Sequence, residues 1–229
     1  MDSEAIKALT GQYVMNTYGR FPVAIDHGEG ARLYDPEGNE YIDFTSGIGV
    51  SCLGYGNEGW ADSIAAQAKK LGHVSNLFYT EPAARLAEKL CQRTGMSNVF
   101  FANGGGEANE GMIKLARKYS FDKYGQGRAT IITLNNSFHG RTITTLTATG
   151  QEVFHNYFFP FTEGFRYADA NSLESLEAAA GDDVCAVMVE LVQGEGAFCR
   201  WIKLTCRRLQ SSARSGTGCC WWTRCKAVL

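Results

Sequence analysis

The sequence predicts an α/β protein in which helices cover a mainly parallel β-sheet. Helical and strand-like segments alternate over residues 60–191, an order typical of strand–helix–strand units. Two strand-like segments, ATIITL at 129–134 and CAVMVEL at 185–191, are nearly continuous apolar runs, which indicates strands buried on both faces. With 229 residues and 45% hydrophobic content, the chain is large enough to bury a sizeable core.

Residues 1–50 are expected to form a small N-terminal lead-in to this domain. A helix is predicted over 3–15, and alternating apolar residues around a Pro-Glu-Gly-Asn turn predict a β-hairpin over 31–44. The larger part, residues 51–196, is expected to contain helices over 60–71, 81–94, 107–119 and 173–181 and strands over 98–103, 129–134, 164–169 and 185–191. No internal repeat interrupts this order.

The composition indicates a soluble, globular protein. No apolar run approaches the roughly 20 residues that a membrane-spanning helix needs, and the polar, acidic N-terminus lacks the pattern of a signal peptide. We therefore expect a cytoplasmic protein without a membrane partner.

The composition changes abruptly near Gly196. All 24 acidic residues precede it, whereas seven of the 22 basic residues follow it, which gives a net charge of −9 before Gly196 and +7 after it. Five of the eight cysteines and three of the four tryptophans also follow it. Because this segment has neither helical nor alternating periodicity, residues 197–229 are expected to be unstructured.

Three glycines mark the first candidate site. Gly104, Gly105 and Gly106 lie between the predicted strand over 98–103 and a helix that opens at Glu107. Glycines let a ligand approach the backbone, and N–H groups at a helix N-terminus attract an anion. A tight turn without a ligand is the alternative. The segment has neither the G-x-G-x-x-G spacing of a dinucleotide fold nor the end of a P-loop, so a different phosphate ligand is favoured.

Two further segments carry groups that could contact a ligand. In the segment 137–142, SFHGRT, the ring of Phe138 can stack on a planar cofactor and the guanidinium of Arg141 can grip a carboxylate with two bonds. Glu190 lies near the end of the predicted strand over 185–191 and Glu195 follows it, at the carboxyl end where α/β enzymes bind ligands. Packed or solvated side chains are the alternative for each short segment. His139 has no evident partner and is expected to be structural.

Together the segments resemble the class III aminotransferases, which use pyridoxal 5′-phosphate (PLP), and among them the acetylornithine type. The resemblance runs over about residues 13–196 and rests on six segments: YGRFP at 18–22, FTSGIGV at 44–50, SNLFYTEP at 75–82, NGGGEANE at 103–110, SFHGRT at 137–142 and ELVQGEG at 190–196. It implies the large domain of the fold-type I PLP-dependent transferases and, for the full-length protein, a homodimer.

The resemblance also implies which residues hold the cofactor. Gly105 and Gly106 would bind the PLP phosphate, Phe138 would stack on the pyridine ring, and Glu190 would lie beside that ring. Gly104 and Gly106 replace the serine and the alanine or threonine that the family usually has, and the loss of a hydroxyl predicts weaker phosphate binding. No metal site is implied.

The implied substrates are an amino acid and a 2-oxo acid. Arg141 would bind the substrate carboxylate, Glu195 would pair with an arginine that gates the pocket, and Tyr18 would belong to the pocket wall. The YGRFP and SNLFY segments favour N-acetylornithine and 2-oxoglutarate, hence arginine biosynthesis; ornithine, succinylornithine and 4-aminobutyrate enzymes remain alternatives.

A non-enzymatic role for the tail is a further alternative. Seven positive charges without an acidic residue would suit a nucleic acid. The tail has no C-x-x-C pair, however, and its adjacent cysteines at 219 and 220 suit neither a zinc site nor an easy disulfide. We therefore do not expect a nucleic acid or a metal as partner.

The family's cofactor-binding lysine and pyridine-binding aspartate follow the Q-G-E-G segment, and neither has an in-frame match here. We therefore expect this chain to be inactive alone. The genetic code suggests why: residues 219–223, CCWWT, are encoded TGY-TGY-TGG-TGG-ACN, and a frame one base earlier reads Leu-Leu-Val-Asp for every synonymous choice. Continued, that frame permits LLVDEVQSG, which resembles the family strand that carries the aspartate.

This pattern yields the hypothesis of a one-base deletion just after the codon for Gly196. It also yields a structural expectation. The parallel sheet should end at the strand over 185–191 and leave an apolar edge where the aspartate-bearing strand would pair.

Overall fold

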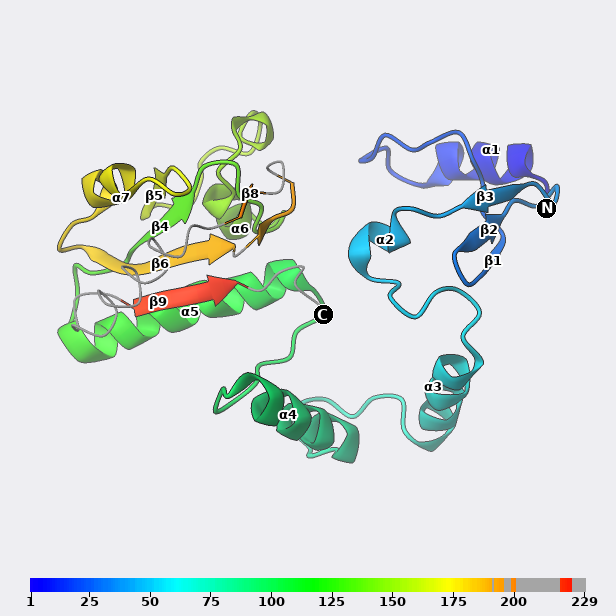
Figure 1. The fold of residues 1–229 in the computed structure, drawn as a ribbon, viewed down its shortest axis with the longest axis horizontal. Helices are drawn as coiled ribbons and strands as arrows, with labels where there is room; N and C mark the ends of the chain where they lie inside the picture. Colours follow the sequence, from blue (N-terminus) through cyan, green and yellow to red (C-terminus); the bar gives the residue numbers. More distant parts are fainter. Residues whose placement is uncertain (191, 196–198, 201–218, 224–229) are drawn as a thin grey trace. The chain divides into compact units, whose positions relative to one another are not determined.

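The computed structural model describes residues 1–190, 192–195, 199–200 and 219–223 (Figure 1). The chain divides into two compact units, Met1–Ala84 and Arg85–Leu229. The boundary predicted after residue 50 lies inside the first unit, since residues 51–84 belong to the same compact unit as residues 1–50. Within the described residues, no helix is long and apolar enough to cross a membrane.

The first unit combines three helices with a small antiparallel sheet. Its elements are α1 (Ser3–Tyr13), β1 (His27–Glu29), β2 (Arg32–Tyr34), β3 (Glu40–Ile42), α2 (Ser46–Gly49) and α3 (Glu58–Lys70). The predicted opening helix and the helix over 60–71 are confirmed within two residues at each end. The predicted hairpin is formed by β2 and β3, and β1 adds a strand on the other side of β2.

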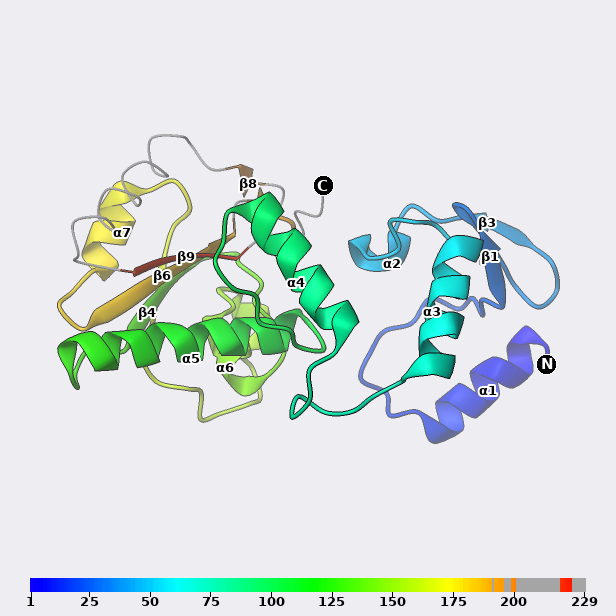
Figure 2. The same cartoon turned by 90° about the horizontal axis from the view of Figure 1, so that it is seen from below.

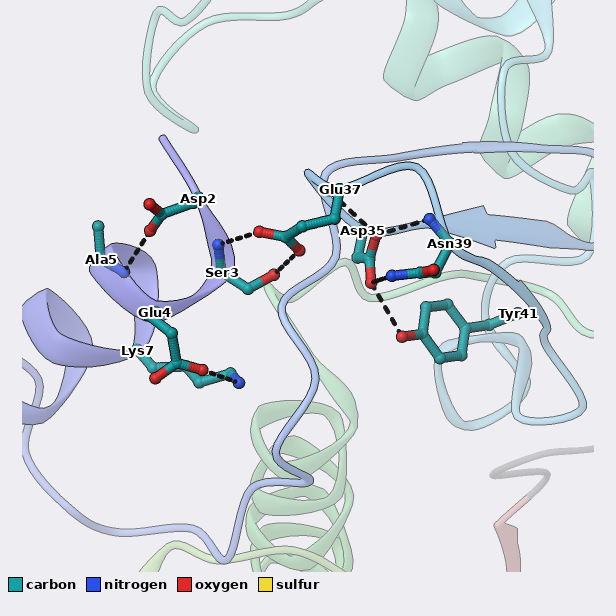
Figure 3. A network of polar contacts seen from close by, with 9 residues as sticks. All are labelled: Asp2, Ser3, Glu4, Ala5, Lys7, Asp35, Glu37, Asn39 and Tyr41. Atoms are coloured by element: carbon teal, nitrogen blue, oxygen red, sulfur yellow. Dashed lines mark hydrogen bonds and ion pairs between the residues drawn. The ribbon is translucent and has the colours of Figure 1, made fainter.

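A polar network ties α1 to the turn between β2 and β3 (Figure 3). The buried carboxylate of Asp35 accepts hydrogen bonds from the backbone N–H of Asn39 at 2.7 Å and from the hydroxyl of Tyr41 at 2.9 Å. Burial opposes ionisation of Asp35, but these bonds outweigh it and hold its pKa below the usual value. Glu37, in the same turn, accepts a hydrogen bond from the Ser3 backbone N–H at 2.8 Å. The hairpin turn thereby fixes the start of α1.

The second unit contains the predicted α/β domain. The helix α4 (Glu81–Thr94) spans the boundary between the units. The elements that follow are α5 (Gly105–Tyr124), β4 (Thr130–Leu134), α6 (Ile143–Ala148), the 3-10 helix η1 (Glu152–Phe154), β5 (Phe165–Ala168), α7 (Leu173–Ala179), β6 (Val184–Glu190), β7 (Val192–Gln193), β8 (Cys199–Arg200) and β9 (Cys219–Thr223). The helices predicted at 81–94, 107–119 and 173–181 and the strands at 129–134, 164–169 and 185–191 are confirmed.

A parallel sheet forms the centre of this unit, in the strand order β5-β4-β6-β9. Apolar clusters pack on both of its faces. On one face α7 contributes Ala179 beside Ile132 of β4, and on the other α5 and α6 contribute Ile113 and Ala148 beside Ile131. Figures 1 and 2 show α7 and α5 on these two faces. Burial on both faces explains why the strand sequences are apolar without alternation.

The long helix α5 owes its orientation to one stripe of side chains. Asn109, Ile113, Ala116 and Ser120 recur at helical spacing, and these four residues are buried. The helix ends at Gly125, whose φ of 80° most side chains cannot adopt. The N-terminus of α5 is thereby held at the carboxyl end of the sheet.

Two expectations about the sheet were wrong. No described strand pairs with residues 98–103, and they form no strand, because an extended segment needs a neighbour for its backbone hydrogen bonds. The sheet also does not end at β6. Residues 219–223 form β9 and pair with β6 in parallel, which satisfies the edge that was expected to be open.

The tail predicted to be unstructured therefore contains two strands. Besides β9, residues Cys199–Arg200 form β8, which pairs with β7 in an antiparallel arrangement. Residues 191, 196–198, 201–218 and 224–229, which include Gly196 and most of the tail, lie outside the described residues.

Candidate functional site

The three glycines lie at the N-terminus of α5. Gly104 is the N-cap in an extended conformation, and Gly105 and Gly106 begin the helix without any side-chain cap. The first N–H groups of a helix have no partner within the helix, and the helix dipole adds positive charge there. The one acidic residue of this turn, Glu107, accepts hydrogen bonds from the backbone and side-chain N–H groups of Asn103 at 2.8 and 2.9 Å. This helix end can therefore receive an anion.

The segment 137–142 packs directly against this helix end. Gly140 has a φ of 138°, and a Cβ atom at this position would lie 3.0 Å from Cα of Gly106 and 2.5 Å from Oγ1 of Thr145. Position 140 therefore requires glycine. The side-chain amide of Asn109, buried in α5, donates a hydrogen bond to the carbonyl of His139 at 2.7 Å. Two motifs far apart in the sequence thus form one cluster.

The strand β6 brings Glu190 to the same cluster. Glu190 is the last residue of this parallel strand and is 4% exposed. Its Oε2 accepts a hydrogen bond from the backbone N–H of Phe138 at 3.2 Å. The sheet thus places a buried carboxylate beside the predicted cofactor-stacking residue, at the carboxyl end where α/β proteins bind ligands.

The guanidinium of Arg141 lies over two aromatic rings. Its Cζ is 4.4 Å from the ring centroid of Phe154 and 5.5 Å from that of Phe138. The two rings meet edge to face, with centroids 6.1 Å apart. Arg141 is exposed, and within the described residues it has no hydrogen bond or ion pair. Its donors are available to an anionic ligand.

His139 is buried in the cluster, as expected for a structural residue. It is 1% exposed, and neither ring nitrogen has a hydrogen-bond partner among the described residues. Burial lowers its pKa to about 4, so the ring is neutral at pH 7. A neutral, enclosed imidazole supports the packing of the loop rather than proton transfer to a ligand.

The structure brings together five of the seven predicted site residues: Gly105, Gly106, Phe138, Arg141 and Glu190. Glu195 is exposed after β7, and Tyr18 belongs to the first unit, where it is 68% exposed. The residues after Tyr18, 19–22, line a groove of about 860 Å³ together with parts of α1, β2 and β3. The roles of Glu195 and Tyr18 stay predictions.

Sequence reasoning missed two residues that shape the cluster. Asn109 lies within the glycine motif, and an amide in the second turn of a helix was the available signal. Phe154 belongs to no motif, and nothing in its sequence context indicates its contact with Arg141. Thr142, at the end of the recognised loop, caps α6 and donates a hydrogen bond to Glu110 at 2.5 Å.

This arrangement corresponds to a known family. Residues 13–214 match the family model described as aminotransferase class-III. The chain belongs to the class III aminotransferases, which are PLP-dependent.

Individual relatives narrow the class. The chain is 56% identical over 200 residues to the acetylornithine aminotransferase of Haemophilus ducreyi and 54% identical over 194 residues to that of Wolinella succinogenes. These alignments cover 87% and 84% of this chain but 51% and 49% of the relatives. The chain thus spans about half the length of the curated relatives it matches.

Solved structures agree with the fold. The ornithine aminotransferase from Toxoplasma gondii ME49 has a TM-score of 0.89 at 30% identity, over 97% of this chain and 53% of that one. The N-acetylornithine aminotransferase from Stenotrophomonas maltophilia K279a has a TM-score of 0.74 at 33% identity, over 94% and 52%. The predicted fold-type I architecture is confirmed.

Proposed function

We propose that this chain supplies the phosphate-binding and carboxylate-binding part of an aminotransferase that exchanges an amino group between N-acetylornithine and 2-oxoglutarate, in cytoplasmic arginine biosynthesis. One observation carries the proposal: the uncapped N-terminus of α5, the 137–142 loop that contains Arg141, and Glu190 of β6 meet at one edge of the sheet. The acetylornithine aminotransferases among its relatives favour N-acetylornithine over ornithine, succinylornithine or 4-aminobutyrate.

The residues present fit PLP. The backbone N–H groups at the start of α5 would hold its phosphate, because no side chain occupies them. Phe138 and Glu190 would flank its ring, and the hydrogen bond from the Phe138 N–H fixes the carboxylate of Glu190 there. When bound, PLP supplies an electron sink for cleavage of the bond between Cα and its hydrogen.

The chain's own contribution is to bind and orient the reactants. Arg141 would hold a substrate carboxylate through two parallel N–H···O bonds. The buried Asn109 keeps the 137–142 loop on α5, so the carboxylate site and the phosphate site stay at a fixed spacing.

Measuring the binding of PLP tests the phosphate site, with pyridoxal, which lacks the phosphate, as the comparison ligand. Gly106→Asp places a carboxylate in the first turn of α5, where it suits the helix dipole and where a Cβ has room, with its nearest neighbour at 4.0 Å. We expect this variant to fold but to bind PLP at least about 10-fold more weakly, through repulsion of the phosphate. Gly72→Asp, at a position with open space, is the matched control. Equal PLP affinity in both variants would contradict the site.

The absence of the pyridine-binding aspartate has a proposed cause in the reading frame. The strand β9 supports it, because residues 219–223 pair with β6 in register and Thr223 is the partner of Glu190. One base earlier, the same codons read Leu-Leu-Val-Asp, and the aspartate codon takes two bases from the codon of Thr223. The restored strand would repeat the pattern of β6, an apolar run that ends in a carboxylate.

Resequencing of the coding strand tests the frame hypothesis codon by codon. To read LLVDEVQ one base earlier, Thr223 must be encoded ACG, Arg224 AGG and Cys225 TGC. A CGN codon for Arg224 removes the glutamate of that frame and would overturn the hypothesis. In the gene together with the coding sequence that follows it, insertion of one base after the codon for Gly196 should, conversely, restore acetylornithine-dependent formation of glutamate.

The homodimer expected for the full-length protein is also a proposal. The first unit exposes large apolar side chains, among them Phe44 at 92% and Leu77 at 85%, which a second copy would cover. Light scattering on the frame-restored protein should give twice the mass of one chain. A monodisperse monomer would contradict the dimer without affecting the PLP proposal.

A further inference from the structure

Phe154 makes a contact that none of the recognised motifs contains. It is the last residue of η1, in the connection between α6 and β5, and it is half-buried. The 4.4 Å between its ring centroid and Cζ of Arg141 is the shorter of the two arginine–ring distances. A cation within about 6 Å of a ring centroid is attracted by the electrons of the ring face.

We infer that Phe154 is a positioning residue that holds Arg141 ready for a substrate carboxylate. Neither ring carries an oxygen or nitrogen acceptor, so a guanidinium held over the two rings keeps its N–H donors available for a bidentate bond. Within the described residues no acceptor takes these donors. The aromatic contacts also restrict a side chain that would otherwise sample many rotamers, which lowers the entropy cost of binding. The inference rests on the proposed function, in which Arg141 binds a carboxylate.

Phe154 can position another residue because its own segment is fixed on both sides. Gln151 donates a side-chain hydrogen bond to the carbonyl of Ser137 at 3.0 Å, which ties η1 to the 137–142 loop. One residue after Phe154, the Nε2 of His155 lies 2.9 Å from the carbonyl oxygen of Leu146 in α6. The segment that carries Phe154 is therefore bonded to the 137–142 loop, which contains Arg141, and to α6, which follows that loop.

The test compares three substitutions in the 229-residue chain. Phe154→Leu keeps an apolar side chain but removes the ring face, and Phe154→Tyr keeps the face. Phe158→Leu, in the same connection between α6 and β5, is the matched control. Among the described residues, the ring of Phe158 contacts that of Tyr157 and not the guanidinium of Arg141. The readout is the NMR signal of the Arg141 Nε–Hε group, assigned with Arg141→Lys, during titration with the dicarboxylate glutarate.

We expect Phe154→Leu to remove the ring-current shift of the Arg141 signal and to weaken glutarate binding about 2- to 5-fold. Phe154→Tyr should restore both values, and Phe158→Leu should change neither. A purely structural role for Phe154 would instead broaden or shift signals throughout the sheet. An unchanged Arg141 signal or an unchanged glutarate affinity in Phe154→Leu would overturn the inference.

The same titration separates this inference from the proposed function. If glutarate binds Arg141→Lys as tightly as the unaltered chain, Arg141 is not the carboxylate site and the proposed function fails at that point. If Arg141→Lys loses binding but Phe154→Leu keeps it, the carboxylate site stands and only the positioning role is refuted.

Discussion

The two units of the chain are stabilised by different interactions. In Met1–Ala84, which the structure describes completely, the buried residues are Ala24 and Asp35 alone, and hydrogen bonds to carboxylates hold the hairpin. In the second unit, Ile131 and Ile132 point to opposite faces of the parallel sheet and each is 1% exposed. The second unit therefore carries its own core and positions the site, whereas the first has little apolar burial of its own.

Truncation of a core side chain should destabilise the second unit far more than truncation of an exposed side chain destabilises the first. Ile131→Ala leaves a cavity between β4 and α5, and we expect it to lower the free energy of unfolding of the second unit by about 2–5 kcal/mol. Ile42→Ala, at a side chain that is 64% exposed in the first unit, should change the free energy of unfolding of the first unit by no more than about 0.5 kcal/mol. Urea unfolding followed by circular dichroism measures both. Similar costs at the two positions would show that the units do not differ in this way.

Acid should weaken the second unit first. The pKa of His139 falls from 6.5 to about 4 on folding, so between these pH values the unfolded chain binds a proton that the folded chain does not bind. The associated stability is complete above about pH 6.5 and is lost as the pH falls toward 4, by on the order of 3 kcal/mol. His139→Gln should flatten the dependence of the unfolding midpoint on pH in this range. The same substitution at exposed His73 is the control, and a slope that survives His139→Gln would exclude this cause.

The first unit should respond at lower pH and with a smaller effect. Hydrogen bonds from the hydroxyls of Thr45 and Tyr55 lower the pKa of Asp43 from 3.8 to about 2. A depressed carboxyl pKa stabilises the folded form above about pH 4, and this stabilisation is lost as the pH falls toward 2. We expect the Thr45 and Ser46 amides, which donate to Asp43, to exchange several-fold faster in Asp43→Asn at pH 5. Unchanged exchange would show that the carboxylate does not hold this segment.

Much of the fold followed from local patterns. Apolar runs located β4 and β6, the alternating order of helices and strands located α3, α4 and α5, and the Pro-Glu-Gly-Asn turn located the hairpin. The strand predicted over 98–103 was wrong because a strand needs a neighbouring strand to pair with, and a local sequence pattern carries no information about that neighbour. The strand β9 was missed for a related reason, since its pairing with β6 is a property of the sheet edge and not of the sequence CCWWT.

The candidate site was predictable where a motif marked it and not where contacts cross between motifs. The glycines, Phe138, Arg141 and Glu190 were identified because their segments resemble family motifs. The close approach of Gly140 to Gly106 and the contact of Phe154 with Arg141 depend on how α5, α6 and η1 pack. Only the three-dimensional arrangement supplies that information.

We propose that this chain holds the anion-binding part of a PLP site without the lysine that would carry the cofactor. The most direct test incubates the purified chain with PLP, reduces it with borohydride and maps modified lysines by mass spectrometry, with an assay for glutamate formed from N-acetylornithine and 2-oxoglutarate. We predict saturable PLP binding that Gly106→Asp weakens, no single lysine modified in stoichiometric amount, and no glutamate. Stoichiometric modification of one lysine, or formation of glutamate, would contradict the proposal that this chain lacks the cofactor-binding lysine.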